Sequence, residues 1–120
     1  MLISGSNTAT ADFPVAPGKP TMVVTLFRSK LTAQAGDDYT EMLTEMLGRA
    51  RTYPGFVAMK SFKADDGERL TVVWWENDEL QAAWRQDDRH REAQRKGRER
   101  WYHYYHIEVA NVLREHQFVR

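Results

Sequence analysis

A short stretch of the chain carries residue types that could do chemistry together if they lie on one helix. The four residues that would fall within about 60° of one face, at about 100° of rotation per residue, are His90, Gln94, Gly97 and Trp101. An inward helix face usually carries Leu or Val, whereas this one carries an imidazole, an amide, a glycine without a side chain and an indole. An imidazole takes up protons near neutral pH, and an indole stacks on flat rings. We therefore interpret this face as one wall of a pocket.

Each residue of this face also has a structural interpretation, and the sequence leaves both interpretations open. Taken alone, His90 is typical of a solvent-contacting residue at a helix start, because it follows Asp88 closely. Gln94 could instead satisfy a backbone group, and Trp101 could instead fill the core. Gly97 costs a helix interior about 1 kcal/mol relative to Ala, which indicates that either a backbone or a ligand approaches it closely.

Further residues border the predicted pocket. Trp84 lies at helical spacing from preceding apolar residues and so projects toward the sheet, where it either fills the core or stacks on a ligand. Arg98 belongs to a basic run interleaved with Glu, but it borders the His90 and Gln94 positions and could reach an anionic ligand. The aromatic segment 101–106 suits either a dimer interface or the mouth of a pocket.

Composition excludes several kinds of chemistry. The chain has 120 residues, which is enough for one domain. Its 17 Lys and Arg residues balance 17 Asp and Glu residues, so the net charge of the chain does not favour binding to nucleic acid. It has no Cys, which excludes thiolate metal sites and thiol nucleophiles. His103 and His106 form a pair without a third ligand, so we predict no metal site.

The beginning of the chain differs in composition from the rest. Residues 1–20 are rich in Ser, Thr, Ala, Gly and Pro, which predicts either a flexible tail or an extended arm anchored on a neighbouring subunit by Phe13 and Val15. The domain itself is assigned to residues 21–120. We find no pattern of a secretory signal and no segment approaching the roughly 20 apolar residues of a membrane helix. We therefore expect a soluble, cytoplasmic protein without a membrane partner.

Hydrophobic periodicity predicts the elements that would position the pocket. Short β-branched or alternating runs indicate strands, and apolar residues at helical spacing indicate helices. The predicted strands are 22–27, 56–62, 70–75 and 107–113, and the predicted helices are 37–52, capped by Asp37 or Asp38, and 77–104, with a break near 86–88. This order predicts an α+β, ferredoxin-like βαββαβ fold, in which an antiparallel four-stranded sheet carries both helices on one face.

The other face of this sheet also needs cover. Residues 70–75 are apolar at successive positions, so both faces of that strand are apolar. The simplest cover is a second copy of the chain packed sheet against sheet. We therefore predict a homodimer.

Several segments of the chain resemble one known family. They are Tyr53-Pro-Gly-Phe56, Trp74-Trp-Glu-Asn-Asp-Glu-Leu-Gln-Ala-Ala-Trp84, His90 and Gln94-Arg-Lys-Gly-Arg-Glu-Arg-Trp-Tyr102. Over residues 21–118 the chain resembles the antibiotic biosynthesis monooxygenase family. The resemblance implies a dimeric α+β barrel. Members of the wider family oxygenate polycyclic phenols or anthrones without metal or flavin, which implies a cofactor-independent monooxygenase acting on a small aromatic compound.

The resemblance also implies roles for the candidate residues. Oxygenation without a cofactor needs a base that turns the substrate into a carbanion or phenolate inside a dry cavity. The expected catalytic base is His90, because the ordinary pKa of an imidazole, about 6.5, suits that role. The residues expected to stack on the ring system are Trp84, Trp101 and Tyr102. Gln94 and Arg98 are expected to orient a substrate oxygen.

Two alternatives accompany this hypothesis. One is a non-catalytic dimer that binds a small hydrophobic ligand. The other is haem binding, because a related haem-degrading group resembles this chain at Trp84. That group has a ligand histidine where this chain has Gln94, and an asparagine on the first strand where Phe27 or a neighbour stands. No cofactor is therefore expected, and haem, for which His90 would have to be the ligand, is the third hypothesis.

Overall fold

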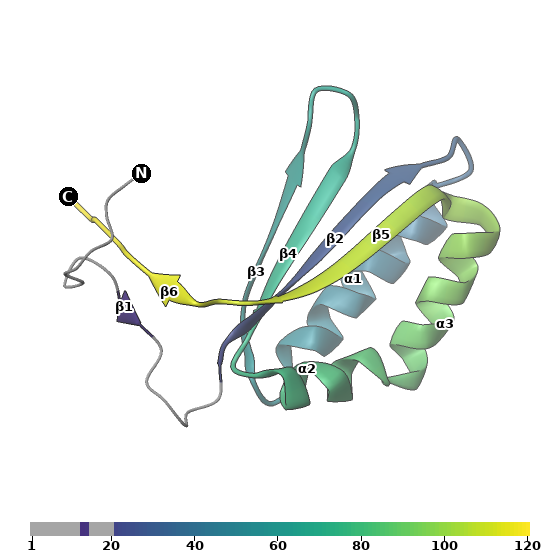
Figure 1. Ribbon diagram of the computed structural model, residues 1–120. Coiled ribbons are helices and arrows are strands. Elements are labelled where there is room, and N and C mark those ends of the chain that lie inside the picture. The colour runs from purple at the N-terminus through teal and green to yellow at the C-terminus, as the bar shows by residue number, and fades with distance from the viewer. Residues whose placement is uncertain (1–12, 15–20) are drawn as a thin grey trace.

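The observed order of strands and helices confirms the predicted ferredoxin-like α+β fold. The computed structural model describes residues 13–14 and 21–120. Four strands form one antiparallel sheet in the order β3-β4-β2-β5, namely β2 (Val23–Leu31), β3 (Phe56–Lys63), β4 (Arg69–Trp75) and β5 (Tyr102–Asn111). One face of this sheet is covered by α1 (Asp37–Arg51), α2 (Asp78–Arg85), α3 (Asp88–Lys96) and the π-helical turn η1 (Gly97–Trp101) (Figure 1).

A second, very short sheet lies apart from the main one. Its two strands, β1 (Phe13–Pro14) and β6 (Arg114–Glu115), pair antiparallel to each other. Figure 1 shows them beyond the end of β5, away from the helices. The other anchor predicted for the N-terminal arm, Val15, lies outside the described residues.

Some predicted element boundaries are wrong. β2 continues through Leu31 instead of ending near Phe27, and the last helix ends at Trp101 instead of near Tyr104. β5 begins at Tyr102, well before the predicted start at Ile107, because its first residue pairs with Leu31 on the long β2. The alternating aromatic residues of this segment favour a strand, and that preference outweighs the continuing helical pattern.

Side-chain caps fix the starts of the two helices that flank the site. The Asn77 side chain accepts a hydrogen bond from the backbone N of Leu80 at 2.9 Å, which begins α2. Asp87 Oδ1 accepts a hydrogen bond from the backbone N of His90 at 2.9 Å, which begins α3. The predicted break near 86–88, with an Asp restarting the helix, is thereby confirmed.

The long helix α1 starts differently from its prediction and supplies much of the core. Its N-cap is Gly36 without a side-chain cap, while Asp37 and Asp38 lie in the first turn, where their charges favour the positive end of the helix dipole. The buried apolar cluster between α1 and the sheet consists of Val23, Met42, Met46, Ala50, Trp75, Trp84 and Trp101. Trp75 is fully buried in this cluster. The core therefore lies on the helical side of the sheet.

The sheet face turned away from the helices carries apolar side chains as well, together with charged ones such as Arg28, Lys60 and Glu108. Because side chains alternate along a strand, this face carries the even-numbered residues of β2 and β4, including Val24, Leu26, Val72 and Trp74. Phe62 and Tyr104 are 46% and 44% exposed. Within the described part of the chain, no helix is both long and apolar enough to span a bilayer.

Candidate active site

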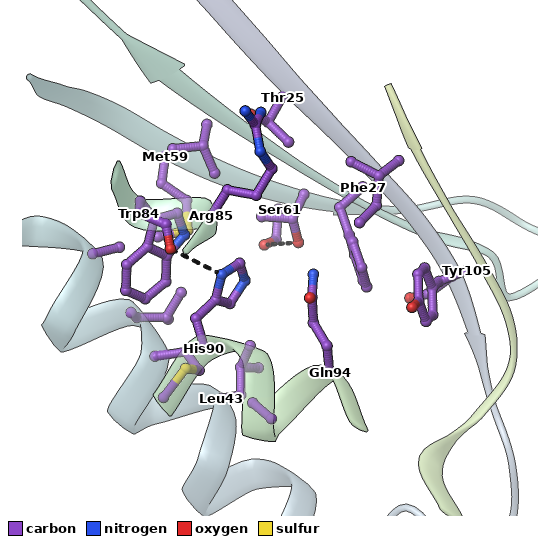
Figure 2. A pocket seen from close by; sticks show the side chains of 18 of the residues that line it. Thr25, Phe27, Leu43, Met59, Ser61, Trp84, Arg85, His90, Gln94 and Tyr105 are labelled. Carbon is purple, nitrogen blue, oxygen red and sulfur yellow. Dashed lines mark hydrogen bonds between the residues drawn. The ribbon is translucent and has the colours of Figure 1, made fainter. Parts of the chain in front are cut away.

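A cavity of about 450 Å³ lies between the inner face of the sheet and the helices (Figure 2). Small-molecule pockets in proteins commonly measure about 300–1,000 Å³, so the cavity can hold a small ring system. Its apolar wall comes from α1, through Met42, Leu43, Met46, Leu47 and Ala50. Its other helical wall comes from α2 and α3, through Gln81, Trp84, Arg85, His90, Ala93 and Gln94.

The register of the sheet arranges the cavity floor in rows that change in polarity. One row runs across the sheet through Arg69, Ser29 and Tyr105. The next row is Ser61, Thr71, Phe27 and Ile107, and the third is Met59, Val73, Thr25 and Val109. The floor is therefore cationic and hydroxylic at one end, mixed in the middle and mainly apolar at the other.

The imidazole of His90 lines the cavity in a single defined tautomer. Its Nδ1 lies 3.3 Å from the carbonyl oxygen of Trp84. Because a carbonyl oxygen only accepts hydrogen bonds, Nδ1 must carry the proton and donate it. The neutral ring therefore has an unprotonated Nε2 with a free lone pair. Figure 2 shows the imidazole of His90 and the amide of Gln94 pointing from α3 into the cavity.

The surroundings of His90 keep its ring neutral near pH 7. Burial lowers the pKa of His90, and the Trp84 carbonyl and the Asp87 charge oppose that shift only in part. The ring also stacks on the Trp84 indole, with centroids 4.3 Å apart and planes 16° from parallel. The arrangement gives a neutral imidazole of fixed orientation, which is what a proton acceptor in a pocket requires.

Asp87 holds the start of α3 in place beneath this histidine. Its carboxylate accepts hydrogen bonds from Arg49 Nη2 at 2.8 Å and from the Tyr53 hydroxyl, besides the backbone N of His90. Its side chain is only 4% exposed. Burial raises the pKa of Asp87, but these hydrogen bonds outweigh burial and hold the pKa well below its usual range. A buried carboxylate thus stays charged.

The other predicted site residues are placed differently from one another. Trp84, Gln94, Trp101 and Tyr102 line the cavity with His90, whereas Arg98 does not line it. Arg98 is exposed, and its Nη1 donates a hydrogen bond to the Tyr105 hydroxyl at 3.0 Å. The indole of Trp101 is buried and donates to Asp38 Oδ2 at 3.1 Å, so this residue serves the core as well as the wall.

Several lining residues come from strands and were not singled out from the sequence. They include Phe27, Arg69 and Tyr105, of which Phe27 and Tyr105 stack with centroids 5.5 Å apart. The sequence signal for them is the alternation of each strand, because every second residue faces the helices. Using that signal requires the correct strand bounds, and Arg69 and Tyr105 lie outside the predicted strands 70–75 and 107–113.

Gly97 makes room for the Tyr102 ring and not for a ligand. A Cβ at position 97 would lie 2.4 Å from Cε2 of Tyr102, and Gly97 does not line the cavity. The ring also contacts Phe27 and Tyr39 edge to face. Both predicted explanations for this glycine, a close backbone and a ligand, are therefore wrong, because the neighbour is the side chain of Tyr102.

Replacing Gly97 by Ala should destabilise the protein despite the better helix propensity of Ala. The added methyl group would force the Tyr102 ring to move, and overpacking of this kind costs about 1–3 kcal/mol. Gly48→Ala is the matched control, because nothing lies within 4 Å of its added Cβ on α1. That control should gain about 0.5–1 kcal/mol. Thermal unfolding of both variants measures the difference, and equal stabilisation would show that Tyr102 moves freely.

The comparison with known proteins agrees with this architecture. The sequence profile of the antibiotic biosynthesis monooxygenase family matches residues 22–96. The chain belongs to this family. Among the described residues, no group of three or more His, Asp or Glu side chains is arranged to hold a metal ion.

Relatives of this monooxygenase family member include proteins of known structure. YqjZ of Bacillus subtilis, an uncharacterized protein, is 31% identical over 107 residues, covering 89% of this chain and 93% of YqjZ. SnoaB of Streptomyces nogalater, a cofactor-independent oxygenase, has a TM-score of 0.65 at 10% identity, over 77% of this chain and 93% of its own. Rv0793 of Mycobacterium tuberculosis has a TM-score of 0.69 at 16% identity, over 79% of this chain and 98% of its own. At these identities the structural likeness concerns the fold alone.

Proposed function

We propose that the protein is a cofactor-independent monooxygenase that acts on a small phenolic or polyaromatic compound. The observation that carries the proposal is His90, whose unprotonated Nε2 is available to a molecule in a largely apolar, aromatic cavity. Membership of the monooxygenase family and the SnoaB-like fold support the same reaction class. Trp84, Trp101 and Tyr102 would contact the ring system, and Gln94 would orient a substrate oxygen.

The chemistry begins with proton transfer to His90. Nε2 takes a proton from a phenol or from an activated C–H group, which leaves an electron-rich anion. This anion passes one electron to dioxygen, and the resulting radical pair combines to form a C–O bond. Return of the proton gives a hydroperoxide, whose distal OH leaves as water with the remaining hydrogen of that carbon, and a carbonyl group is left. One oxygen atom thus enters the product and the other leaves as water.

Oxygen uptake by the purified protein tests this proposal. Uptake with anthrone or a panel of phenols, without added metal, flavin or haem, should require the protein, and labelled dioxygen should place one atom in the product. Saturable binding without any uptake would instead favour the ligand-binding dimer. A saturable Soret shift with haemin that is lost in His90→Ala would favour haem binding and would contradict the role of His90 as the base.

We also propose that the chain forms a homodimer through the sheet face turned away from the helices. The supporting observation is the set of apolar side chains on that face, which includes Leu26, Trp74 and the 46% exposed Phe62. Light scattering should give about twice the chain mass of 14.0 kDa. Leu26→Asp should give the monomer mass, because it buries a charge in the interface. A monomeric wild-type protein at micromolar concentration would contradict the dimer.

A further inference from the structure

The charged residues that line the cavity are all cationic. Arg69 on β4 and Arg85 at the end of α2 both contribute to the lining, and no Asp or Glu is among the described residues that do so. Within the described chain, no carboxylate forms an ion pair with either arginine. A guanidinium that faces a largely apolar space without a counter-charge favours an anion there, because charge-assisted pairs are strongest where water is scarce.

Arg69 is the better placed of the two cations. It is partly buried and lies directly opposite Ser29 on β2, which in turn lies opposite Tyr105 on β5. Opposite side chains on one sheet face have Cβ atoms about 4.5–5.5 Å apart, so Ser29 is the direct neighbour of both Arg69 and Tyr105. Its charge also acts on the hydroxyl of Tyr102. This end of the cavity therefore combines a guanidinium with several hydroxyl groups.

The phenol of Tyr105 adds a hydrogen-bond donor to this end. Its oxygen accepts a hydrogen bond from Arg98 Nη1 at 3.0 Å, which leaves its own O–H free to donate. The exposed Arg98 thus orients a cavity residue from outside, and it adds a second positive charge near the same end. Arg85 differs, because it is exposed and its Nη1 already donates to Gln81 Oε1 at 2.5 Å.

We propose that the compound bound in the cavity is an aromatic carboxylate, whose anionic group pairs with Arg69 while its ring lies between Phe27 and the helical wall that carries His90. The expectation that this carboxylate is oxygenated rests on the proposed function, whereas the expectation that it binds does not. The carboxylate anchors the ring at the polar end of the floor. The hydroxyl or activated carbon at the opposite end of the ring then points toward His90.

Calorimetric titration with two matched probes tests the carboxylate. The probes are para-hydroxycinnamate and its neutral amide, para-hydroxycinnamamide, which share the ring and the phenol. The wild-type protein should bind the carboxylate more tightly than the amide by about tenfold or more. Arg69→Gln should remove this preference and leave the affinity for the amide unchanged, and Arg69→Lys should restore part of it.

The control variants separate a local pairing from a general charge effect. Arg91→Gln removes the same charge from an exposed position on α3 outside the cavity and should keep the full preference. A wild-type protein that binds both probes equally would overturn the proposal. So would retention of the preference in Arg69→Gln, or its loss in Arg85→Gln alone.

The outcome for binding is independent of the outcome for oxygenation. A carboxylate preference without oxygen uptake from any substrate would keep the site assignment and contradict the oxygenase. Oxygen uptake with neutral phenols, together with no carboxylate preference, would support the oxygenase and overturn the substrate class inferred here.

Discussion

His90→Ala should abolish most oxygen consumption while leaving ligand binding nearly intact. The variant removes the only imidazole that lines the cavity among the described residues, and loss of a general base costs about 100-fold or more in rate. The ring also covers part of the Trp84 indole, so some weakening of aromatic binding accompanies the change. Steady-state oxygen uptake gives the effect on kcat, and calorimetry with a non-reacting ligand gives the effect on affinity.

His103→Ala is the matched control for this variant. His103 is exposed on β5, outside the cavity, so its removal should leave kcat unchanged. His90→Gln separates shape from basicity, because it keeps a polar side chain that is not a base at neutral pH. Full oxygen uptake by His90→Ala would remove this residue from the mechanism. An equal loss in both histidine variants would indicate a folding defect.

The pH dependence of the same reaction follows from the surroundings of the imidazole. Burial lowers the pKa of His90 below its ordinary 6.5, and only the neutral ring accepts a proton. The value of kcat/KM should therefore rise with pH through a midpoint below 6.5 and stay level above it. The contribution of His90 to stability depends on pH in the same direction as kcat/KM does. The unfolded chain takes up the proton at a higher pH than the folded chain, so this part of the stability is lost as pH falls below the unfolded pKa.

The sequence predicts the helical wall of the site well, because helical spacing is a local property. The positions of His90 and Gln94 follow from it directly. The tautomer of His90 does not, because its Nδ1 pairs with a carbonyl six residues earlier, across the break between α2 and α3. That contact depends on the angle at which the two helices meet, which Asp87 sets through contacts with α1 and the following loop.

Arg98 shows why α-helical periodicity does not predict side-chain directions at the end of this wall. The chain passes from α3 into the π-helical turn η1 at Gly97, and a π-helix has more residues per turn than an α-helix. The angular position of Arg98 therefore differs from that expected for a continuous α-helix, and its side chain lies outside the lining. The floor is harder still to predict. Arg69 and Tyr105 meet only through Ser29, which lies beyond the predicted end of β2.

Asp87→Ala should strongly destabilise the protein. Its side chain is 4% exposed, caps α3 and accepts hydrogen bonds from Arg49 and Tyr53. Loss of a cap costs about 1 kcal/mol. Loss of hydrogen bonds to a charged group adds about 1.5–3 kcal/mol. We expect a total of about 3 kcal/mol in the free energy of unfolding, measured by urea denaturation.

Asp88→Ala is the neighbouring control. Asp88 is exposed in the first turn of α3 and caps nothing, so its removal should change stability little. Asp87→Asn keeps the acceptor oxygen of the cap and the side-chain volume but removes the charge. Its loss of unfolding free energy should therefore fall between those of Asp87→Ala and Asp88→Ala. If Asp87→Ala unfolds at the same urea concentration as Asp88→Ala, the buried carboxylate does not stabilise the fold.

Acid should reveal the charge of Asp87 separately from its shape. The hydrogen bonds that it accepts hold its pKa in the folded chain below the unfolded value, so its contribution is complete above about pH 4 and is lost as pH falls further. Wild-type stability should therefore fall more steeply below pH 4 than that of Asp87→Asn. Because Asp87 positions the backbone of His90, Asp87→Asn should also lower kcat without moving the pH midpoint far, as the loss of a positioning group requires. A shift of the midpoint toward the ordinary imidazole value would instead show that α3 opens and that His90 becomes hydrated.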